Sequence, residues 1–457
     1  MADSGVLLPI SIAIYLSLSY TVALFLVSRR RRPPSLPAPT NLLFVFVLPC
    51  LNEELVIGQS LERLLSMPGN FVVLVIDDGS EDATADVVRS AGDERVHLLR
   101  RVPPNARNGK GRALNCAYQY LLHSDVLDGR FPDDVVLAVL DADGRVALNA
   151  LTEVAPYFRD PKVGGVQIGV RMYNARSTLL ARIQDFEFIA YNEIFQRGRQ
   201  RLGSVGLGGN GQFTRLSALR TLGEEPWSDF LTEDLDLGIR LLLNGWHNSF
   251  CPTTYVSQQA LTRIRPLVRQ RTRWFQGHLQ TWRRIPMILR SGLPTRTMLD
   301  LVNLVLQPGL LLAISLVPPA VISILLTALA SEPSGLAHAL VDHWGINILC
   351  LYLLTFGLAP FYAFTFWLHE ESISFPRALV YAYIYTLYSY MWFIAGWRAV
   401  GRILTGRSSW AKTARIPETQ PAISSTPVPT AAKDPTAPSM IDVTAISASA
   451  ERFSADR

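Results

Sequence analysis

The sequence predicts a polar α/β domain inserted between membrane-spanning helices, and three observations lead to this prediction. The chain of 457 residues is 49% hydrophobic and 18% charged, and its mean hydropathy of +0.20 is higher than that of a typical soluble protein. Uncharged apolar stretches long enough to cross a bilayer lie near the N-terminus and in the C-terminal third. Between them, short β-rich apolar runs alternate with helical stretches.

The first apolar stretch is expected to anchor the chain in a membrane. Residues 7–27 form a run of 21 residues without a charge, enough to cross a hydrocarbon core of ~30 Å at ~1.5 Å per residue. Four arginines follow at 29–32 and only Asp3 precedes the run, so the positive-inside rule places residue 29 onward in the cytosol. A cleaved signal peptide has its basic residues before the apolar run, and residues 1–32 are therefore interpreted as a retained anchor.

The polar domain is predicted to span residues 40–290, after a proline-rich linker at 33–40. Its apolar runs are continuous, as expected for parallel strands that helices cover on both faces. The predicted strands are residues 42–48, 71–76, 135–140 and 163–170.

The C-terminal region, residues 298–400, contains apolar stretches at 298–330, 346–368 and 379–400. The first is longer than one span needs and contains three prolines, so it is expected to combine an interfacial helix with a spanning one. Three crossings would place the basic start of the tail, 401–457, outside the cell, against the positive-inside rule. Either one stretch does not cross, or the long one crosses twice. The rest of the tail has the composition of a disordered segment.

The charge and the cysteines exclude other classes of protein. The net charge is +5 and the pI is about 9.0, but the arginines concentrate beside apolar segments, which indicates membrane orientation rather than nucleic-acid binding. The four cysteines form no CxxC pair, so neither a disulfide framework nor a structural zinc site is expected. The polar domain is therefore placed in a reducing cytosol, on a multi-pass protein of the plasma membrane.

Two predicted strands end in paired carboxylates. Asp77 and Asp78 follow the strand at 71–76, where they could hydrogen-bond a ribose or a base, although turn and helix-cap chemistry uses the same residue types. Asp141 and Asp143 follow the strand at 135–140, where alternating carboxylates could hold a hard divalent cation and through it a diphosphate. The alternative there is a solvated acidic turn.

Two further signals point to a reaction. Glu233 and Asp234 open a helix with an apolar face, either as a general base or as acidic residues that the helix dipole stabilises. Lys110 lies between two glycines, where it could supply charge to an anion or simply belong to a basic loop. His247 and His278 are isolated and are interpreted as surface or packing residues.

The motifs DDGS, DAD, TED and QRTRW occur in this order, and together they resemble glycosyltransferase family 2, especially the membrane-embedded cellulose, chitin and hyaluronan synthases. The resemblance covers about residues 45–282, and WAKTAR at 410–415 is similar to a segment after the last span in that branch. It implies a GT-A fold, a nucleotide-sugar donor such as a UDP-sugar, Mg²⁺ or Mn²⁺, and transfer with inversion at the anomeric carbon.

The resemblance also implies roles for individual residues. Asp234 would be the catalytic base, Asp143 the metal ligand, and Glu233 and Trp274 acceptor-binding residues. The donor-binding residues would be Glu53, Asp77, Asp78, Lys110, Asp141, Gln270 and Arg273. The glycine-rich segment at 206–215 lies where the polymer synthases carry an acceptor loop, but its residues depart from those of a cellulose synthase.

The leading hypothesis is an inverting transferase that extends a β-linked polysaccharide and passes it through its own spans. The alternative is a single addition to a membrane lipid such as diacylglycerol, and polar and aromatic side chains lining the later spans would favour the first. A noncatalytic membrane scaffold with the same fold is the hypothesis from a different class. The sugar, the linkage, the oligomeric state and any export partner stay open.

Overall fold

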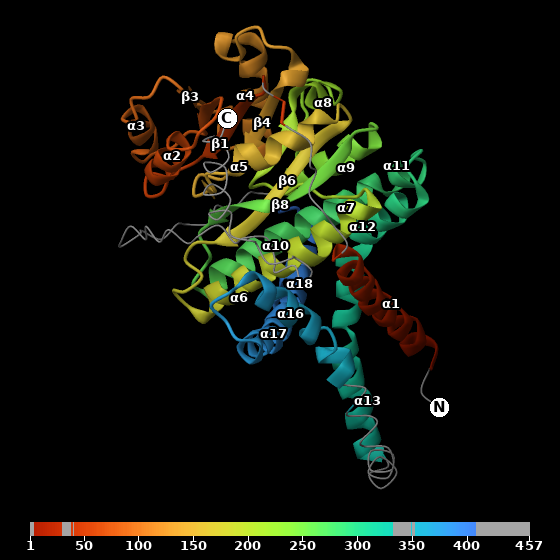
Figure 1. The fold of residues 1–457 in the computed structure, drawn as a ribbon. Coiled ribbons are helices and arrows are strands. Elements are labelled where there is room, and N and C mark those ends of the chain that lie inside the picture. The colour runs from red at the N-terminus through yellow and green to blue at the C-terminus, as the bar shows by residue number, and fades with distance from the viewer. Residues whose placement is uncertain (1–3, 30–37, 40, 332–348, 350–351, 408–457) are drawn as a thin grey trace, which may run out of the picture. The chain divides into compact units, whose positions relative to one another are not determined.

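The structure is a computed structural model that describes residues 4–29, 38–39, 41–331, 349 and 352–407. Its centre is an eight-stranded sheet with the strand order β3-β2-β1-β4-β7-β6-β8-β5 (Figure 1). The strands are β1 Leu43–Cys50, β2 Phe71–Asp77, β3 Val96–Arg100, β4 Val135–Val139, β5 Arg145–Val146, β6 Val163–Met172, β7 Gln212–Arg215 and β8 His247–Gln258.

All four predicted strands are present, as β1, β2, β4 and β6. Strands β1 to β4 pair in parallel, as do β6 and β8, whereas β7 is antiparallel to both β4 and β6. The sheet is therefore mixed rather than wholly parallel. Sequence patterns did not reveal β7 and β8, because β7 has four residues and β8 carries many polar ones.

Helices cover both faces of the sheet because side chains of the buried strands alternate between two apolar cores. In β1, Phe44, Phe46 and Leu48 join one core, and Leu43 and Val45 join the other. Helices α2 Ile57–Leu65, α3 Thr84–Arg89 and α5 Ala150–Val154 pack on the first core, and α4 Lys110–His123, α8 Leu216–Arg220 and α9 Glu233–Leu243 on the second. Short 3₁₀ turns occupy Asp125–Leu127, Pro132–Asp134, Ala155–Arg159 and Thr281–Arg284.

A second group of helices packs beside the sheet domain. Helix α10, Ile264–Gln280, lies along α18, Met391–Leu404, and also contacts α12, Thr295–Ser315 (Figure 1). Helix α6, Leu179–Ala190, contacts α16, Ala359–His369, and α17, Phe375–Ser389. A π-helical turn, Tyr191–Gln196, links α6 to α7, Arg197–Leu202, and both this turn and α7 contact α1, Ser4–Ser28. Helices α11 Ile285–Leu289 and α13 Val317–Ser331 also belong to the described part of the chain.

Two helical segments, Thr295–Pro319 and Phe375–Leu404, are long and apolar enough to cross a membrane, by length and composition alone. They cover parts of the first and third predicted C-terminal stretches. Leu16–Ser28 of α1 is a shorter apolar helix. The second stretch is described except at residues 346–348, 350 and 351 and contains α16, whereas the WAKTAR segment lies outside the described residues.

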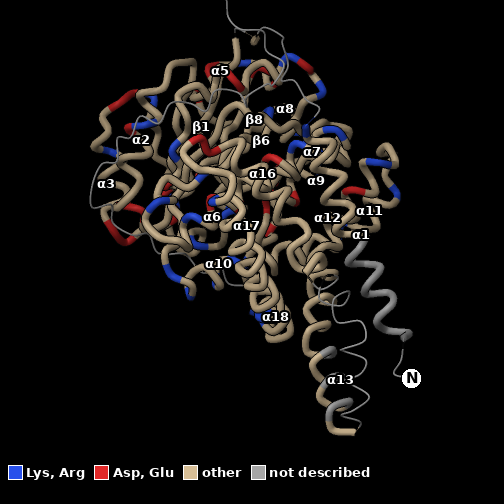
Figure 2. Tube along the Cα trace, turned by 60° about the horizontal axis from the view of Figure 1, so that its bottom comes forward, with Lys and Arg blue, Asp and Glu red and all other residues tan. Residues whose placement is uncertain are grey.

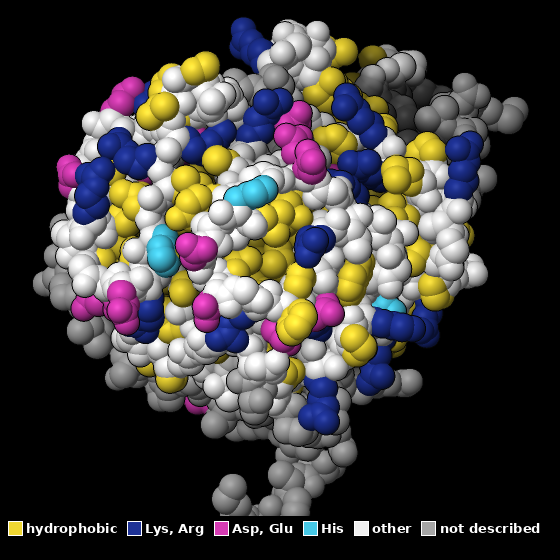
Figure 3. Space-filling view, turned by 90° about the horizontal axis from the view of Figure 1, so that it is seen from above, with side chains coloured by type: hydrophobic (Ala, Val, Ile, Leu, Met, Phe, Trp, Pro, Cys, Tyr) yellow, Lys and Arg dark blue, Asp and Glu magenta, His cyan; other side chains and the backbone are white. Residues whose placement is uncertain are grey.

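Helix α13 differs in charge from the sheet domain. Lysines, arginines and acidic residues surround the sheet, whereas α13 is free of charge along its described length (Figure 2). On the face of the sheet domain shown in Figure 3, cationic and anionic side chains are interspersed. The apolar end of the molecule is therefore the one that α13 forms with its neighbouring helices.

Candidate active site

A cavity of about 1070 Å³ lies between the sheet domain and the C-terminal helices. Nine of the eleven residues predicted to form the site line this cavity, and the two that do not are Asp77 and Asp143. The nine are Glu53, Asp78, Lys110, Asp141, Glu233, Asp234, Gln270, Arg273 and Trp274. The structure thus gathers residues that are up to 221 positions apart, from Glu53 to Trp274, around one space.

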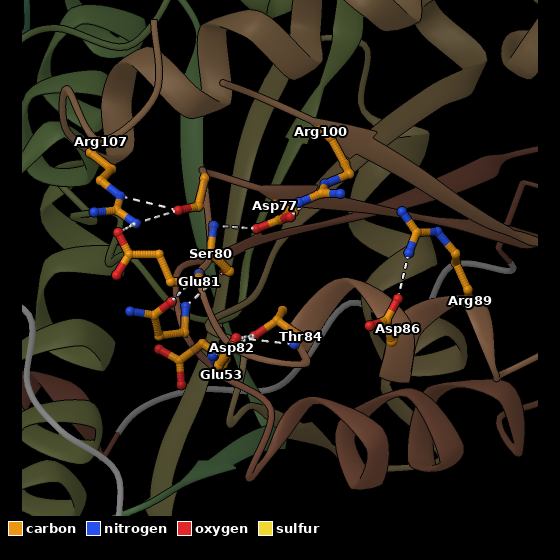
Figure 4. A network of polar contacts seen from close by, with 12 residues as sticks. Glu53, Asp77, Ser80, Glu81, Asp82, Thr84, Asp86, Arg89, Arg100 and Arg107 are labelled. Atoms are coloured by element: carbon orange, nitrogen blue, oxygen red, sulfur yellow. Dashed lines mark hydrogen bonds and ion pairs between the residues drawn. The ribbon is translucent and has the colours of Figure 1, made fainter. Parts of the chain in front are cut away.

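The carboxylates after β2 have different surroundings. Asp77 is fully buried and accepts hydrogen bonds from the backbone nitrogen of Ser80 at 2.8 Å and from Arg100 at 3.0 Å (Figure 4). Asp78 faces the cavity and pairs with Arg101 at 2.5 Å. Burial raises the pKa of Asp78, and Arg101 acts in the opposite direction. Asp77 therefore has the partners of a turn-stabilising residue. Of the two carboxylates, Asp78 is the one that faces the cavity.

Lys110 lies at the centre of the polar end of the cavity. Gly109 adopts a φ of 106°, which favours glycine, and the chain turns there into α4 with Lys110 as its first residue. The ammonium group donates to Asp141 at 2.6 Å and to the carbonyl of Gly209 at 2.7 Å. Burial opposes its charge, but Asp141 and Glu233 outweigh burial and raise the pKa of Lys110. It is a buried, charged lysine beside carboxylates.

The glycine-rich segment at 206–215 contacts the predicted base. A Cβ atom on Gly209 would come within 3.1 Å of both the Asp234 carboxylate and the Lys110 ammonium. Asn210 accepts a hydrogen bond from the backbone nitrogen of Asp141 at 3.2 Å and donates to Gln258 at 2.8 Å. The segment thus brings its backbone close to the carboxylates, which a larger side chain at 209 would prevent.

Glu233 and Asp234 form an acidic pair at the start of α9. Burial and the charge of Asp234 raise the pKa of Glu233 to about 7, and burial also raises the pKa of Asp234. Lys110 lowers both pKa values in part. Because a general base works best when its pKa lies near the working pH, this pair is suited to accept a proton from a hydroxyl group.

The carboxylates also fit a divalent cation that arrives with a diphosphate. Asp141, Glu233 and Asp234 face a single ammonium group, so the polar end carries an excess of negative charge. Asp143 is buried and accepts a hydrogen bond from the backbone nitrogen of Gln259 at 2.9 Å. Across the described residues, no cluster of three His, Cys, Asp or Glu side chains is placed to hold a metal. Mg²⁺ usually needs only one or two carboxylates plus substrate phosphates, and Asp141 on the cavity wall can supply one, whereas Asp143 is not on that wall.

Helix α10 presents the QRTRW residues to the cavity. Gln270, Arg273 and Trp274 are spaced i, i+3 and i+4, so they share one face of the helix, and all three line the cavity. The ring of Trp274 meets Phe188 edge-to-face, with centroids 6.3 Å apart. The indole thus lies at the cavity wall beside Phe188.

Sequence patterns missed Arg271 and its partner Glu187. Arg271 is 1% exposed and binds Glu187 at 2.5 Å, and Glu187 also accepts hydrogen bonds from Tyr388 at 3.0 Å and from Trp392 at 3.2 Å. A signal was available in the segment FEFIA, where a lone glutamate stands among apolar residues. Such a glutamate requires a buried partner.

The other end of the cavity is apolar and is built by helices far from the sheet. Helices α12 and α13 contribute the side chains of Leu304, Pro308, Leu310, Leu311, Ile314, Val317, Pro318 and Ile322. Leu18 of α1 adds to this apolar wall, and hydroxyl-bearing side chains border it: Ser17 and Thr21 of α1, Tyr385, Thr386 and Ser389 of α17, and Tyr390. One space therefore joins a charged end at the sheet to an apolar end between the candidate spans.

The sheet order, the acidic strand ends, the buried lysine and the carboxylate pair define a nucleotide-sugar-dependent glycosyltransferase domain. The comparison with protein families agrees, since the profile described as "Glycosyltransferase like family 2" matches residues 39–277. The chain belongs to this family.

Characterised relatives include both lipid and polysaccharide transferases. The chain is 33% identical to the beta-monoglucosyldiacylglycerol synthase of Nostoc sp. over 289 positions. The aligned region covers 61% of this chain and 57% of that protein. Identity to the poly-beta-1,6-N-acetyl-D-glucosamine synthase of Staphylococcus epidermidis is 27%, covering 51% and 53%. The chain thus matches little more than half the length of these relatives.

A solved structure supports the GT-A fold. The mannosyltransferase PcManGT from Pyrobaculum calidifontis, in complex with GDP-Man and Mn²⁺, superposes with a TM-score of 0.54 at 18% identity. The match covers 83% of this chain and 99% of that one. At this identity the likeness concerns the fold alone.

Proposed function

We propose that this protein transfers one sugar from a nucleotide sugar to a hydroxyl group of a neutral membrane lipid of the diacylglycerol type. The observation that carries the proposal is the continuous cavity, which is charged at the sheet and apolar between the candidate spans. A nucleotide sugar matches the first end, and the acyl chains of a lipid match the second. Asp234, at the charged end, and Trp274 both line this cavity.

The reaction follows from the residues at the junction of the two ends. Asp234 accepts the proton of the lipid hydroxyl, whose oxygen attacks the anomeric carbon of the donor sugar from the face opposite the leaving diphosphate. Lys110, Arg273 and Gln270 supply positive charge and hydrogen bonds to the donor. A divalent cation held at Asp143, with Asp141, would neutralise charge on the departing diphosphate. The product has the inverted anomeric configuration.

The relatives favour the lipid acceptor over the polysaccharide that the sequence motifs suggested first. The three most similar relatives compared are beta-monoglucosyldiacylglycerol synthases, at 32–33% identity, whereas the polysaccharide synthases match at 27%. Polymer extension is the second candidate, because Tyr362, Tyr385, Tyr390, Trp392 and Phe393 line the cavity and aromatic rings also bind sugars.

A membrane setting is part of the proposal. The catalytic domain, residues 40–290, would lie at the cytosolic face of the plasma membrane, with 1–32 as an anchor and spans within 298–400. Arg29 stacks on Phe25 at 4.7 Å and donates to Thr365 at 2.7 Å, so the end of α1 is joined to α16 by a cation suited to the membrane boundary.

The experiment uses membranes that contain the full chain, incubated with a panel of radiolabelled nucleotide sugars and with dioleoylglycerol. The product is separated into solvent-extractable lipid and retained polymer. We expect label in the lipid fraction, dependent on one nucleotide sugar and on the added diacylglycerol. Label that is found only in retained polymer contradicts the proposal and supports polymer extension.

A further inference from the structure

A cluster of polar side chains stands on the cavity wall beyond the predicted base, and none of its members belongs to the sequence motifs. Tyr191, Arg199, His278 and Gln307 all line the cavity. They come from the π-helical turn, α7, α10 and α12. We call these four residues the polar collar.

The polar collar lies one helical turn from Trp274. His278 is four residues after Trp274 on α10, so the two side chains share one face of the helix and both reach the cavity. One turn corresponds to about 5.4 Å along the axis. The Asp234 carboxylate acts on Tyr191 electrostatically. A ligand group in the polar collar would therefore be next to a hydroxyl held at the base.

Arg199 interacts with Asp300, Tyr20 and Tyr191, and part of its hydrogen-bonding capacity is left over. Its side chain is 1% exposed, and its Nη1 nitrogen has no hydrogen-bond partner among the described residues. Leaving a buried donor unsatisfied is costly, so a ligand that supplies an acceptor oxygen there gains affinity. Arg199 as a residue also lines the cavity, so its side chain stands beside any molecule bound there.

Gln307 gives a second, independent observation. It lies within Thr295–Pro319, one of the two segments apolar enough to cross a membrane. Its neighbours on the cavity wall are Leu304, Pro308 and Leu311. A polar side chain inside a membrane-spanning segment is expensive and is usually retained for function.

The polar collar is electrically neutral overall. Arg199 pairs with Asp300 at 3.3 Å, both side chains are 1% exposed, and Ser204 and Tyr20 also donate to Asp300. Burial, with a contribution from Arg199, lowers the pKa of His278 to about 4, so His278 is uncharged at neutral pH. A neutral collar that offers hydrogen-bond donors suits ester carbonyls and discriminates against a phosphate, which would need an uncompensated cation.

From these observations, and resting on the proposed function, we infer that the polar collar is the acceptor headgroup subsite: Arg199, Gln307, Tyr191 and His278 bind the ester and glycerol oxygens of an uncharged diacyl lipid. The acyl chains then lie along α1, α12 and α13, and the free hydroxyl points to Asp234. The polar collar would thereby select uncharged glycerolipids over lipid phosphates.

The test measures acceptor and donor kinetics on the purified full-length protein in detergent micelles, with dioleoylglycerol as the acceptor. Gln307→Leu and Arg199→Lys are the variants, and the second retains the cation that Asp300 needs. Loss of a hydrogen bond to the acceptor is expected to raise the KM for dioleoylglycerol by roughly 3- to 10-fold. The KM for the nucleotide sugar should stay as in the wild type. Asn303→Leu, four residues earlier on α12 and not on the cavity wall, is the matched control.

The outcomes separate the subsite from the proposed function. If the wild type labels lipid but both variants have the acceptor KM of Asn303→Leu, the subsite is wrong and the function stands. If the wild type labels no lipid, the function and the subsite fall together. Phosphatidic acid with the same acyl chains should not compete with dioleoylglycerol, and equal competition would overturn the assignment to neutral lipids.

Discussion

The guanidinium carbon of Arg271 lies 4.2 Å from the centroid of the Trp274 ring, and its Nη2 atom lies 2.5 Å from the Glu187 carboxylate. Glu187 in turn binds Tyr388 of α17 and Trp392 of α18. The aromatic ring at the junction of the cavity is therefore held by a buried charge that the C-terminal helices help to fix. Through this chain of contacts, α17 and α18 help to determine where the Trp274 ring stands.

The Arg271–Glu187 pair is expected to be essential for stability. Glu187→Gln leaves a guanidinium that is 1% exposed without its counter-ion, and breaking a buried pair from one side costs about 3–5 kcal/mol. Thermal unfolding of the purified protein should show a markedly lower midpoint. Glu371→Gln, at an exposed position, is the control and should melt like the wild type. Equal midpoints for the two variants would show that the pair contributes little.

Asp234→Asn is expected to abolish transfer while nucleotide binding persists. The amide keeps the size of the side chain but cannot take a proton. Loss of one general base typically lowers the rate by about 10²- to 10⁴-fold. Turnover of the nucleotide sugar and calorimetric titration with UDP measure the two properties. Asp229→Asn, at an exposed carboxylate that pairs with Arg112, provides the control. Turnover at the original rate would mean that another group is the base.

The acidic limb of the pH–rate profile is expected at a higher pH than the pKa of an ordinary aspartic acid would give. Burial raises the pKa of Asp234, and the base must lose its proton to act, so the rate rises as pH increases through the raised pKa of this carboxyl group. Glu233→Gln removes the negative charge beside Asp234 and should move the limb to lower pH. Lys110→Met removes the opposing cation and should move it to higher pH.

The measurement is kcat against pH for both variants. If the acidic limb moves in the same direction in Glu233→Gln and in Lys110→Met, this account is contradicted. The direction in which the limb shifts is the informative quantity, because both substitutions are also expected to slow the reaction. Each variant is therefore compared with its own maximal rate.

Much of the fold could be predicted because the parallel strands have a strong local signature. Four continuous apolar runs became β1, β2, β4 and β6 with boundaries within two residues. β7 and β8 had no such signature, since their place depends on pairing with β4 and β6. The mixed pairing of the sheet is thus a tertiary property that residue patterns do not contain.

The candidate site shows the same limit. Nine of the eleven residues predicted from the motifs line one cavity. The motifs could not distinguish Asp78, which faces the cavity, from Asp77, which accepts hydrogen bonds from Ser80 and Arg100. Nor could it find Arg199, whose importance arises from burial beside Asp300 on a helix 100 residues away. Adjacent carboxylates look alike in sequence, and their roles separate only when the neighbours in space are known.

A divalent cation is expected to tighten nucleotide binding through Asp143. Calorimetric titration of the protein with UDP, in the presence of Mn²⁺ and then of EDTA, should show affinity that falls on removal of the metal. Asp143→Asn should reduce the difference between the two conditions, because it removes a carboxylate ligand. Asp133→Asn, at an acidic position whose carboxylate binds Ser217 away from the cavity, is the control. An undiminished metal effect in Asp143→Asn would exclude that residue as the ligand.

Trp274→Ala is expected to damage transfer far more than it affects membrane insertion. The indole lies at the wall of the cavity beside Phe188 and under Arg271, so its loss removes the surface against which an acceptor is positioned. If Trp274 were only an interfacial anchor, its replacement would instead reduce the amount of protein in the membrane fraction. Trp397→Ala is the matched control, because this tryptophan is 47% exposed on α18 and binds Ser315 at 2.9 Å. Transfer per membrane-inserted molecule should fall at least about 10-fold for Trp274→Ala, as expected when a positioning contact is lost, and should change little for Trp397→Ala. Equal rates per inserted molecule would assign Trp274 to anchoring alone.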